Sequence, residues 1–212
     1  MLEGKKIIVT GSASGMGEAT LKAYVKAGAN VVGMDISDQK GKEISLNADK
    51  TGPGKCSFIQ IDVSDKDSVK NAFDLALGEL KALDVLAHPA AIQGPADASN
   101  VKVEDWDNMF AVNVRGTMLT NQTAFKYMKE NGSGSIINFG SISGLRPEPS
   151  ASAYSAAKGA VHSWTRTAAG TWGKFNIRVN AILPAIATPM YYAARKRSTE
   201  EENTVAHWRN SV

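Results

Sequence analysis

Thr10-Gly11-Ser12-Ala13-Ser14-Gly15-Met16-Gly17 is the stretch that decides the fold of this chain. It lies between the apolar run 6–10 and an amphipathic stretch over 15–27, so it is predicted to join a strand to a helix. Gly11 permits the tight turn, while Gly15 and Gly17 let the backbone approach a bound group closely. The free N–H groups at the start of the helix suit a pyrophosphate. The expected cofactor-binding residues of this turn are Gly11, Ser14, Gly15, Met16 and Gly17. A purely structural turn is the alternative, because the spacing differs from the commoner G-x-G-x-x-G.

Short apolar runs alternate with longer amphipathic stretches along the rest of the chain. The predicted strands cover 6–10, 30–34, 56–61, 83–87, 134–139 and 177–182. The predicted helices cover 15–27, a stretch from Asp38, 65–80 with Asp65 as N-cap, 104–129 and the segment around Tyr154. Strands without polar alternation, separated by helices, indicate a parallel sheet covered on both faces. We therefore predict a single α/β domain over 1–212, doubly wound, that binds its ligand at the carboxyl ends of the strands.

Composition restricts the partners and the compartment. Hydrophobic residues make up 43% and charged residues 21% of the 212, which is typical of a soluble globular protein. The net charge is +3 and no basic run exceeds Arg195-Lys196-Arg197, so no nucleic-acid partner is expected. The sequence contains neither a membrane-spanning stretch nor a signal-peptide pattern, and Cys56 is the single cysteine. We expect a cytoplasmic protein with no metal site and no membrane contact.

Acidic residues end two of the predicted strands. Asp35 can accept hydrogen bonds from the ribose hydroxyls of an adenosine, and its charge would repel a 2′-phosphate. Because Ile36 follows it and no arginine or lysine stands nearby, NAD is favoured over NADP. Asp62 and Val63 end the third strand and would border the adenine. A solvated turn residue is the alternative for Asp35, and an ordinary helix-capping aspartate is the alternative for Asp62.

Tyr154 and Lys158 lie four residues apart, which places them on one face of the predicted helix. A fixed positive charge favours the phenolate and moves the pKa of a tyrosine toward neutrality. Such a tyrosine can pass a proton to or from an alcohol oxygen. The alternatives are a partly buried aromatic residue at Tyr154 and a solvated charge at Lys158.

Together with the glycine-rich turn, Asn113, Ser141 and Tyr154-x-x-x-Lys158 resemble the short-chain dehydrogenase/reductase family over about residues 5–190. The resemblance implies a Rossmann-like fold and an oxidoreductase that transfers a hydride between NAD(H) and a secondary alcohol or ketone. Tyr154 would be the general acid/base, and Lys158 would lower its pKa and bind the nicotinamide ribose. Ser141 would hold the substrate oxygen, and Asn113 would position a water beside Lys158. The alternatives are a loop residue that caps the next helix at Ser141 and, at Asn113, a side chain that satisfies a neighbouring backbone group. The resemblance also implies a homodimer or homotetramer that packs through the long helices.

Three departures from the family pattern affect the site. His88-Pro89-Ala90-Ala91 replaces Asn-Asn-Ala-Gly, where Ala90 and Ala91 would approach the nicotinamide ribose. For His88, a packing or backbone-bonded role is favoured over a second acid/base. Pro184 to Thr188 lacks the usual glycine, although both residues are still expected to contact the cofactor. The sequence ends at Val212, before the seventh strand of the family, and 191–212 is expected to form a substrate lid.

Two alternatives to the dehydrogenase remain open. The first is a catalytically silent NAD-binding protein, either a redox sensor or a partner subunit. The short C-terminus and the altered segments 88–91 and 184–185 favour it. The second is an isomerase or dehydratase that retains its NAD between turnovers. Cofactor binding without turnover would indicate the first, and substrate loss without net NADH production would indicate the second.

Overall fold

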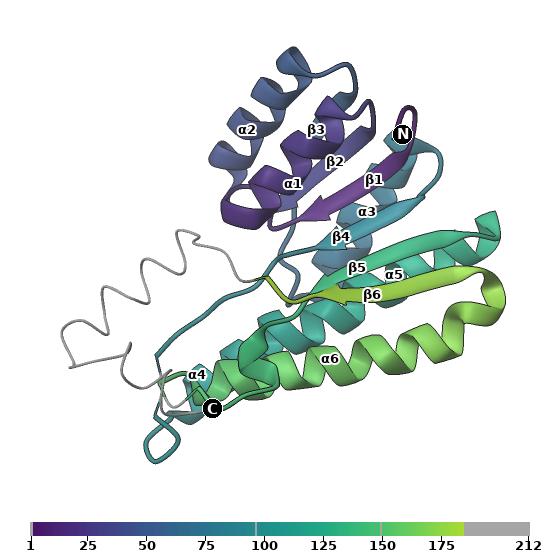
Figure 1. Ribbon diagram of the computed structural model, residues 1–212. Helices are drawn as coiled ribbons and strands as arrows, with labels where there is room; N and C mark the ends of the chain where they lie inside the picture. Colours follow the sequence, from purple (N-terminus) through teal and green to yellow (C-terminus); the bar gives the residue numbers. More distant parts are fainter. Residues whose placement is uncertain (1, 96, 149, 185–212) are drawn as a thin grey trace.

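A parallel sheet of six strands forms the centre of the computed structural model, which describes residues 2–95, 97–148 and 150–184 (Figure 1). The strands are β1 (Lys6–Thr10), β2 (Asn30–Asp35), β3 (Lys55–Gln60), β4 (Val85–His88), β5 (Gly134–Phe139) and β6 (Ile177–Ile182). Their order in the sheet is β3-β2-β1-β4-β5-β6. The order reverses between β1 and β4, and in doubly wound sheets ligands bind in the crevice at this point. The predicted α/β fold is confirmed.

Helices cover the sheet on both sides. They are α1 (Gly15–Lys26), α2 (Asp38–Thr51), α3 (Lys66–Leu80), α4 (Val103–Phe110), α5 (Gly116–Asn131) and α6 (Ser152–Trp172), with shorter turns η1 (Ala111–Arg115), η2 (Ile142–Gly144) and η3 (Gly173–Phe175). Ile7 and Val9 of β1 pack in one cluster with side chains of α1 and α2. Ile8 points to the opposite face, where it packs in a cluster with residues of α3, α5 and α6. Burial on both faces explains why the strand sequences lack polar alternation.

The cap predicted for α3 is also confirmed. The carboxylate of Asp65 accepts a hydrogen bond from the backbone N–H of Ser68 at 2.6 Å. This bond satisfies one of the N–H groups that a helix start leaves without an intrahelical partner.

The helix predicted over 104–129 is present as a continuous helical segment over 103–131, but it is not a regular α-helix throughout. A π-helical turn, η1, separates α4 from α5 and contains Asn113. The Asn113 side chain bonds to the backbone of Ile92, and its own carbonyl oxygen accepts a hydrogen bond from the Thr117 hydroxyl at 2.7 Å. Single π-helical turns within α-helices frequently occur at functional sites.

Several sequence expectations fall outside the described ranges. Thr188 and the expected lid at 191–212 are among them. Within 2–95, 97–148 and 150–184, no helix has both the length and the apolar character that a membrane crossing requires. In the same ranges, no group of three or more His, Cys, Asp or Glu side chains could hold a metal ion.

Candidate active site

The glycine-rich turn packs too tightly to accept larger residues. Gly11 and Gly15 have positive φ angles of 61° and 52°, in the left-handed region that favours glycine. A Cβ atom on Gly17 would collide with the carbonyl oxygen of Gly11, and one on Gly11 would lie 2.7 Å from the Cα atom of Ala90. The turn, α1 and the segment after β4 therefore meet at one place, at the carboxyl edge of the sheet.

The start of α1 is suited to an anion. Ser14 is the N-cap residue, but its side chain makes no capping hydrogen bond. The N–H groups of the first turn, including that of Met16, therefore have no partner from the Ser14 hydroxyl. A helix start with free N–H groups attracts negative charge such as a phosphate.

Asp35 fixes the glycine-rich turn to the end of β2. Its carboxylate accepts hydrogen bonds from the backbone N–H groups of Ala13 at 3.0 Å and Ser37 at 2.9 Å. Each carboxylate oxygen can accept more than one hydrogen bond, so capacity remains for ribose hydroxyls. Ile36 lies beside it with 63% of its surface exposed.

The two residues expected after β3, Asp62 and Val63, play different structural roles. Asp62 accepts hydrogen bonds from both the N–H and the hydroxyl of Ser64, at 2.9 and 2.7 Å. Since Asp65 caps α3, the helix-capping alternative for Asp62 is wrong. The Val63 side chain is buried and would lie 3.0 Å from a Cβ on Gly116, so it serves packing.

His88 is an interior residue. Its Nδ1 lies 2.7 Å from the Thr10 hydroxyl and 3.3 Å from the Thr120 hydroxyl. Complete burial, with a further contribution from the Lys158 charge, lowers the pKa of His88 to about 3. The ring is therefore neutral at physiological pH, which confirms the packing role, although its partners are threonine side chains rather than backbone groups.

Lys158 is buried, with 4% of its surface exposed, and its Nζ donates to the carbonyl oxygen of Phe139 at 2.6 Å. Burial lowers the pKa of its ammonium group to about 8, because removal from water disfavours the charged form. The Nζ atom lies 5.6 Å from the centroid of the Tyr154 ring. The solvated alternative for Lys158 is therefore wrong.

The Tyr154 phenol is half-buried, and burial raises its pKa above the ordinary value of 10.0, while a hydrogen bond with Ser141 acts in the opposite direction. This direction is opposite to the lowering expected from Lys158. The physical reason is that desolvation of the phenol outweighs its hydrogen bond with Ser141.

Asn113 fixes the segment after β4. Its Oδ1 accepts from the backbone N–H of Ile92 at 2.8 Å, and its Nδ2 donates to the Ile92 carbonyl at 2.9 Å and contacts Met109 Sδ at 3.0 Å. The alternative in which Asn113 satisfies neighbouring backbone is thus what the structure shows. The bonds hold Ala90 and Ala91, which directly precede Ile92, near the glycine-rich turn.

His162 is a site residue that the sequence analysis missed. Its Nε2 accepts a hydrogen bond from the backbone N–H of Ser141 at 3.2 Å. The sequence feature that could have identified His162 is its position four residues after Lys158, on the same face of α6.

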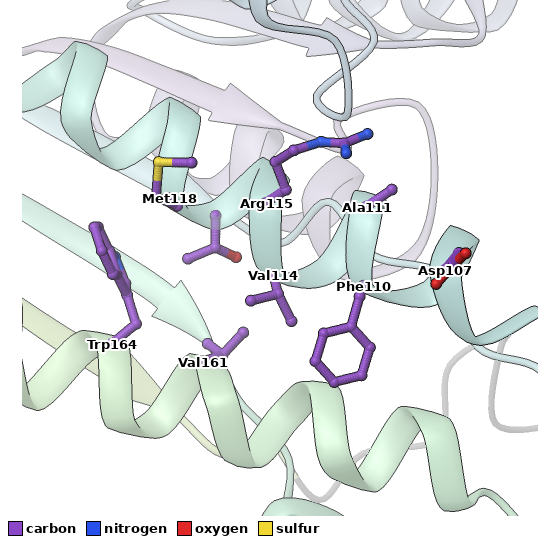
Figure 2. Close-up of a pocket in the computed structure, with 9 residues that line it drawn as sticks. Asp107, Phe110, Ala111, Val114, Arg115, Met118, Val161 and Trp164 are labelled. Carbon is purple, nitrogen blue, oxygen red and sulfur yellow. The ribbon is translucent and has the colours of Figure 1, made fainter. Parts of the chain in front are cut away.

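Pro184, the last described residue, follows β6 at the same edge of the sheet. A separate groove of about 530 Å³ lies between α6 and the α4–α5 segment (Figure 2). None of the predicted site residues lines this groove.

The model of the short chain dehydrogenase family matches residues 5–199. This chain belongs to the short-chain dehydrogenase/reductase family. It is 36% identical over 190 residues to a 3-oxoacyl-(acyl-carrier-protein) reductase of Thermotoga maritima, with 89% of this chain and 77% of that protein covered. It is also 36% identical over 187 residues to a cyclopentanol dehydrogenase of a Comamonas species, covering 88% and 74%.

Solved structures of the family share the fold. A crystal structure of the 3-ketoacyl-(acyl-carrier-protein) reductase from Brucella melitensis, complexed with NADH, superposes with a TM-score of 0.84 at 32% identity, covering 91% of this chain and 80% of that one. Membership places this short-chain dehydrogenase/reductase among oxidoreductases that use a nicotinamide cofactor.

Proposed function

We propose that this chain transfers a hydride between NAD(H) and a secondary alcohol or the matching ketone, with Tyr154 as general acid/base. The observation that carries the proposal is the position of Tyr154, which bonds to Ser141 and lies beside the buried Lys158. Catalytic acids and bases are commonly found where burial and a neighbouring charge act on one titratable group.

The roles of the three side chains follow from their chemistry. When bound, the nicotinamide supplies or accepts the hydride at its C4 atom. The Tyr154 hydroxyl gives its proton to the substrate oxygen in reduction and takes it back in oxidation. Ser141 donates a hydrogen bond to the same oxygen and polarises the carbonyl. The Lys158 ammonium favours the phenolate that Tyr154 becomes and would bind the nicotinamide ribose, and Asn113 would position a water beside it.

The cofactor site fits a dinucleotide. The backbone of the glycine-rich turn is packed too closely for a Cβ atom at Gly17, and the pyrophosphate would lie against the N–H groups at the start of α1. Asp35 would accept the adenosine ribose hydroxyls and repel a 2′-phosphate, which favours NAD over NADP. The residues expected along the adenine and the nicotinamide are Ile36, Asp62, Val63, Ala90, Ala91, Pro184 and Thr188.

The proposal also covers the extent of the domain, the cellular compartment, the partner and the assembly. We infer one dinucleotide-binding and catalytic domain over 1–212, with 191–212 as substrate lid, in a cytoplasmic protein whose partner is a small alcohol or ketone and not a nucleic acid. We infer a homodimer or homotetramer that packs through α5 and α6. The groove of Figure 2 supports this assembly, because apolar side chains such as Val114, Val161 and Trp164 line it.

The direct test follows NADH absorbance while the protein is mixed with NAD and a panel of secondary alcohols. We expect turnover in the native protein, and a loss of about 100-fold or more in kcat for Tyr154→Phe, because the phenylalanine cannot exchange a proton. Tyr127→Phe is the matched control, since it removes a phenol that bonds to Asp74 outside the site.

Full turnover by Tyr154→Phe would contradict the assigned mechanism. NAD binding without turnover on the whole panel would indicate the silent nucleotide-binding alternative. Loss of substrate without net NADH would indicate an isomerase or dehydratase.

A further inference from the structure

His162 contacts the site from the same helix face as the two residues already described. Tyr154, Lys158 and His162 follow one another at intervals of four on α6, so their side chains project from one side. The His162 side chain is buried, with 6% of the residue exposed. Its Nε2 accepts the backbone N–H of Ser141 at 3.2 Å. An imidazole nitrogen accepts a hydrogen bond only when it carries no proton, so the neutral ring holds its proton on Nδ1.

The chain around Ser141 leaves space for this ring. A Cβ atom on Gly140 would collide with His162 Nε2, and one on Gly144 would lie 2.9 Å from His162 Cε1. A side chain at either glycine would displace the imidazole or the loop. The two glycines and the histidine therefore form one packed unit on both sides of Ser141.

The bonds of Ser141 reach different neighbours: its N–H donates to His162, and its carbonyl oxygen accepts from the N–H of Gly144 at 3.0 Å. The Ser141 hydroxyl accepts from the N–H of Ser143 and donates to the Ser143 hydroxyl, both at 3.2 Å, and it also bonds to Tyr154. The Ser143 contacts fix the side chain relative to its own turn, η2, and the Tyr154 contact reaches α6 through the side chain. The bond to His162 joins the Ser141 main chain, rather than its side chain, to α6.

We propose that His162 is a positioning residue for Ser141, because its Nε2 holds the Ser141 main chain against α6 so that the hydroxyl stays in register with Tyr154. This inference rests on the proposed hydride transfer, in which Ser141 holds the substrate oxygen. A shift of this loop would misplace that oxygen relative to the phenol, and small misplacements lower kcat strongly.

The surroundings of His162 favour the neutral imidazole, which can accept the hydrogen bond from Ser141. Burial, and then the charges of Lys158 and Arg166, lower the pKa of His162 below its ordinary value of 6.5. The neutral ring therefore predominates at pH 7, and its acceptor nitrogen remains available.

The experiment compares His162→Leu, His162→Gln and the control Ser163→Ala, which changes an exposed neighbour. Leucine fills a similar volume but accepts no hydrogen bond, whereas the Oε1 atom of glutamine can replace Nε2 as acceptor. We expect kcat to fall about tenfold in His162→Leu, the Kd of NADH to stay within about twofold, and His162→Gln to recover most of the loss. Ser163→Ala should match the native protein.

Native kcat in His162→Leu, or a kcat in His162→Gln as low as that of the leucine variant, would overturn the inference. A native protein that binds NADH but turns over no substrate would instead overturn the proposed function. Nitrogen-15 NMR of the native His162 ring then decides the inference independently of activity. We expect a protonated Nδ1 and a bare Nε2 at pH 7, and a protonated Nε2 would overturn it.

Discussion

At the scale of single residues, Asp35 combines a structural and a chemical role. It accepts two backbone N–H groups, from Ala13 and Ser37, and so orders the turn on which the pyrophosphate would lie. The carboxylate keeps the capacity for further hydrogen bonds, which the adenosine ribose would use in the proposed cofactor site. In the proposed function, this carboxylate is the group expected to favour NAD over NADP.

Asp35→Asn should weaken the preference for NAD over NADP. We expect the native protein to show a kcat/KM for NAD at least about tenfold above that for NADP, and the asparagine variant to reduce the ratio by about tenfold, because the repulsion of the 2′-phosphate is lost. Steady-state kinetics with both cofactors provide the measurement. Asp38→Asn, which removes an exposed carboxylate at the start of α2, is the control. An unchanged ratio in Asp35→Asn would show that other groups set the preference.

The sequence allowed the site residues to be identified, but it did not allow their burial or their hydrogen-bond partners to be predicted. The spacing of Tyr154 and Lys158 was visible in the sequence. The burial that raises the pKa of Tyr154, and the bond from Lys158 to Phe139, depend on elements that are distant in sequence. His162 was missed because the glycines that accommodate it lie about twenty residues before it.

At the scale of elements, the π turn η1 could not be predicted from the hydrophobic pattern of the sequence. The apolar spacing over 104–129 predicts a helix, and it does not distinguish an α-helix from one with a single wider turn. The partner of Asn113 is the backbone of Ile92, 21 residues earlier in the chain. Only the tertiary structure brings the two together.

Asn113→Ala should destabilise the fold. The substitution removes two part-buried hydrogen bonds to the N–H and the carbonyl of Ile92, and a typical intramolecular hydrogen bond contributes about 0.5–1.5 kcal/mol. We expect the free energy of unfolding in urea to fall by at least about 1 kcal/mol. Asn108→Ala, on the exposed side of α4, should change it by less than about 0.5 kcal/mol. Equal stability of the two variants would contradict the importance of the Ile92 contacts.

At the scale of the whole molecule, the parallel sheet brings the predicted site residues together at one edge. Because all six strands run in one direction, their carboxyl ends meet at one edge, and the glycine-rich turn, Asp35, Asp62, Ala90, Ser141 and Pro184 follow those ends. The fold class and this edge were predictable from buried strands that alternate with helices. The close packing of Ala90 on Gly11 was not predictable, since the two residues are distant in sequence and meet only in the folded structure.

Transfer of deuterium from labelled cofactor is the most direct measurement of the proposed chemistry. The protein is incubated with a ketone that it reduces and with NADH carrying deuterium on either face of C4, and the alcohol is analysed by mass spectrometry. We predict one deuterium on the carbinol carbon from one of the two labelled forms, and none from the other. An alcohol without deuterium from either form, or one that takes its label from heavy water instead, would contradict direct hydride transfer in this protein.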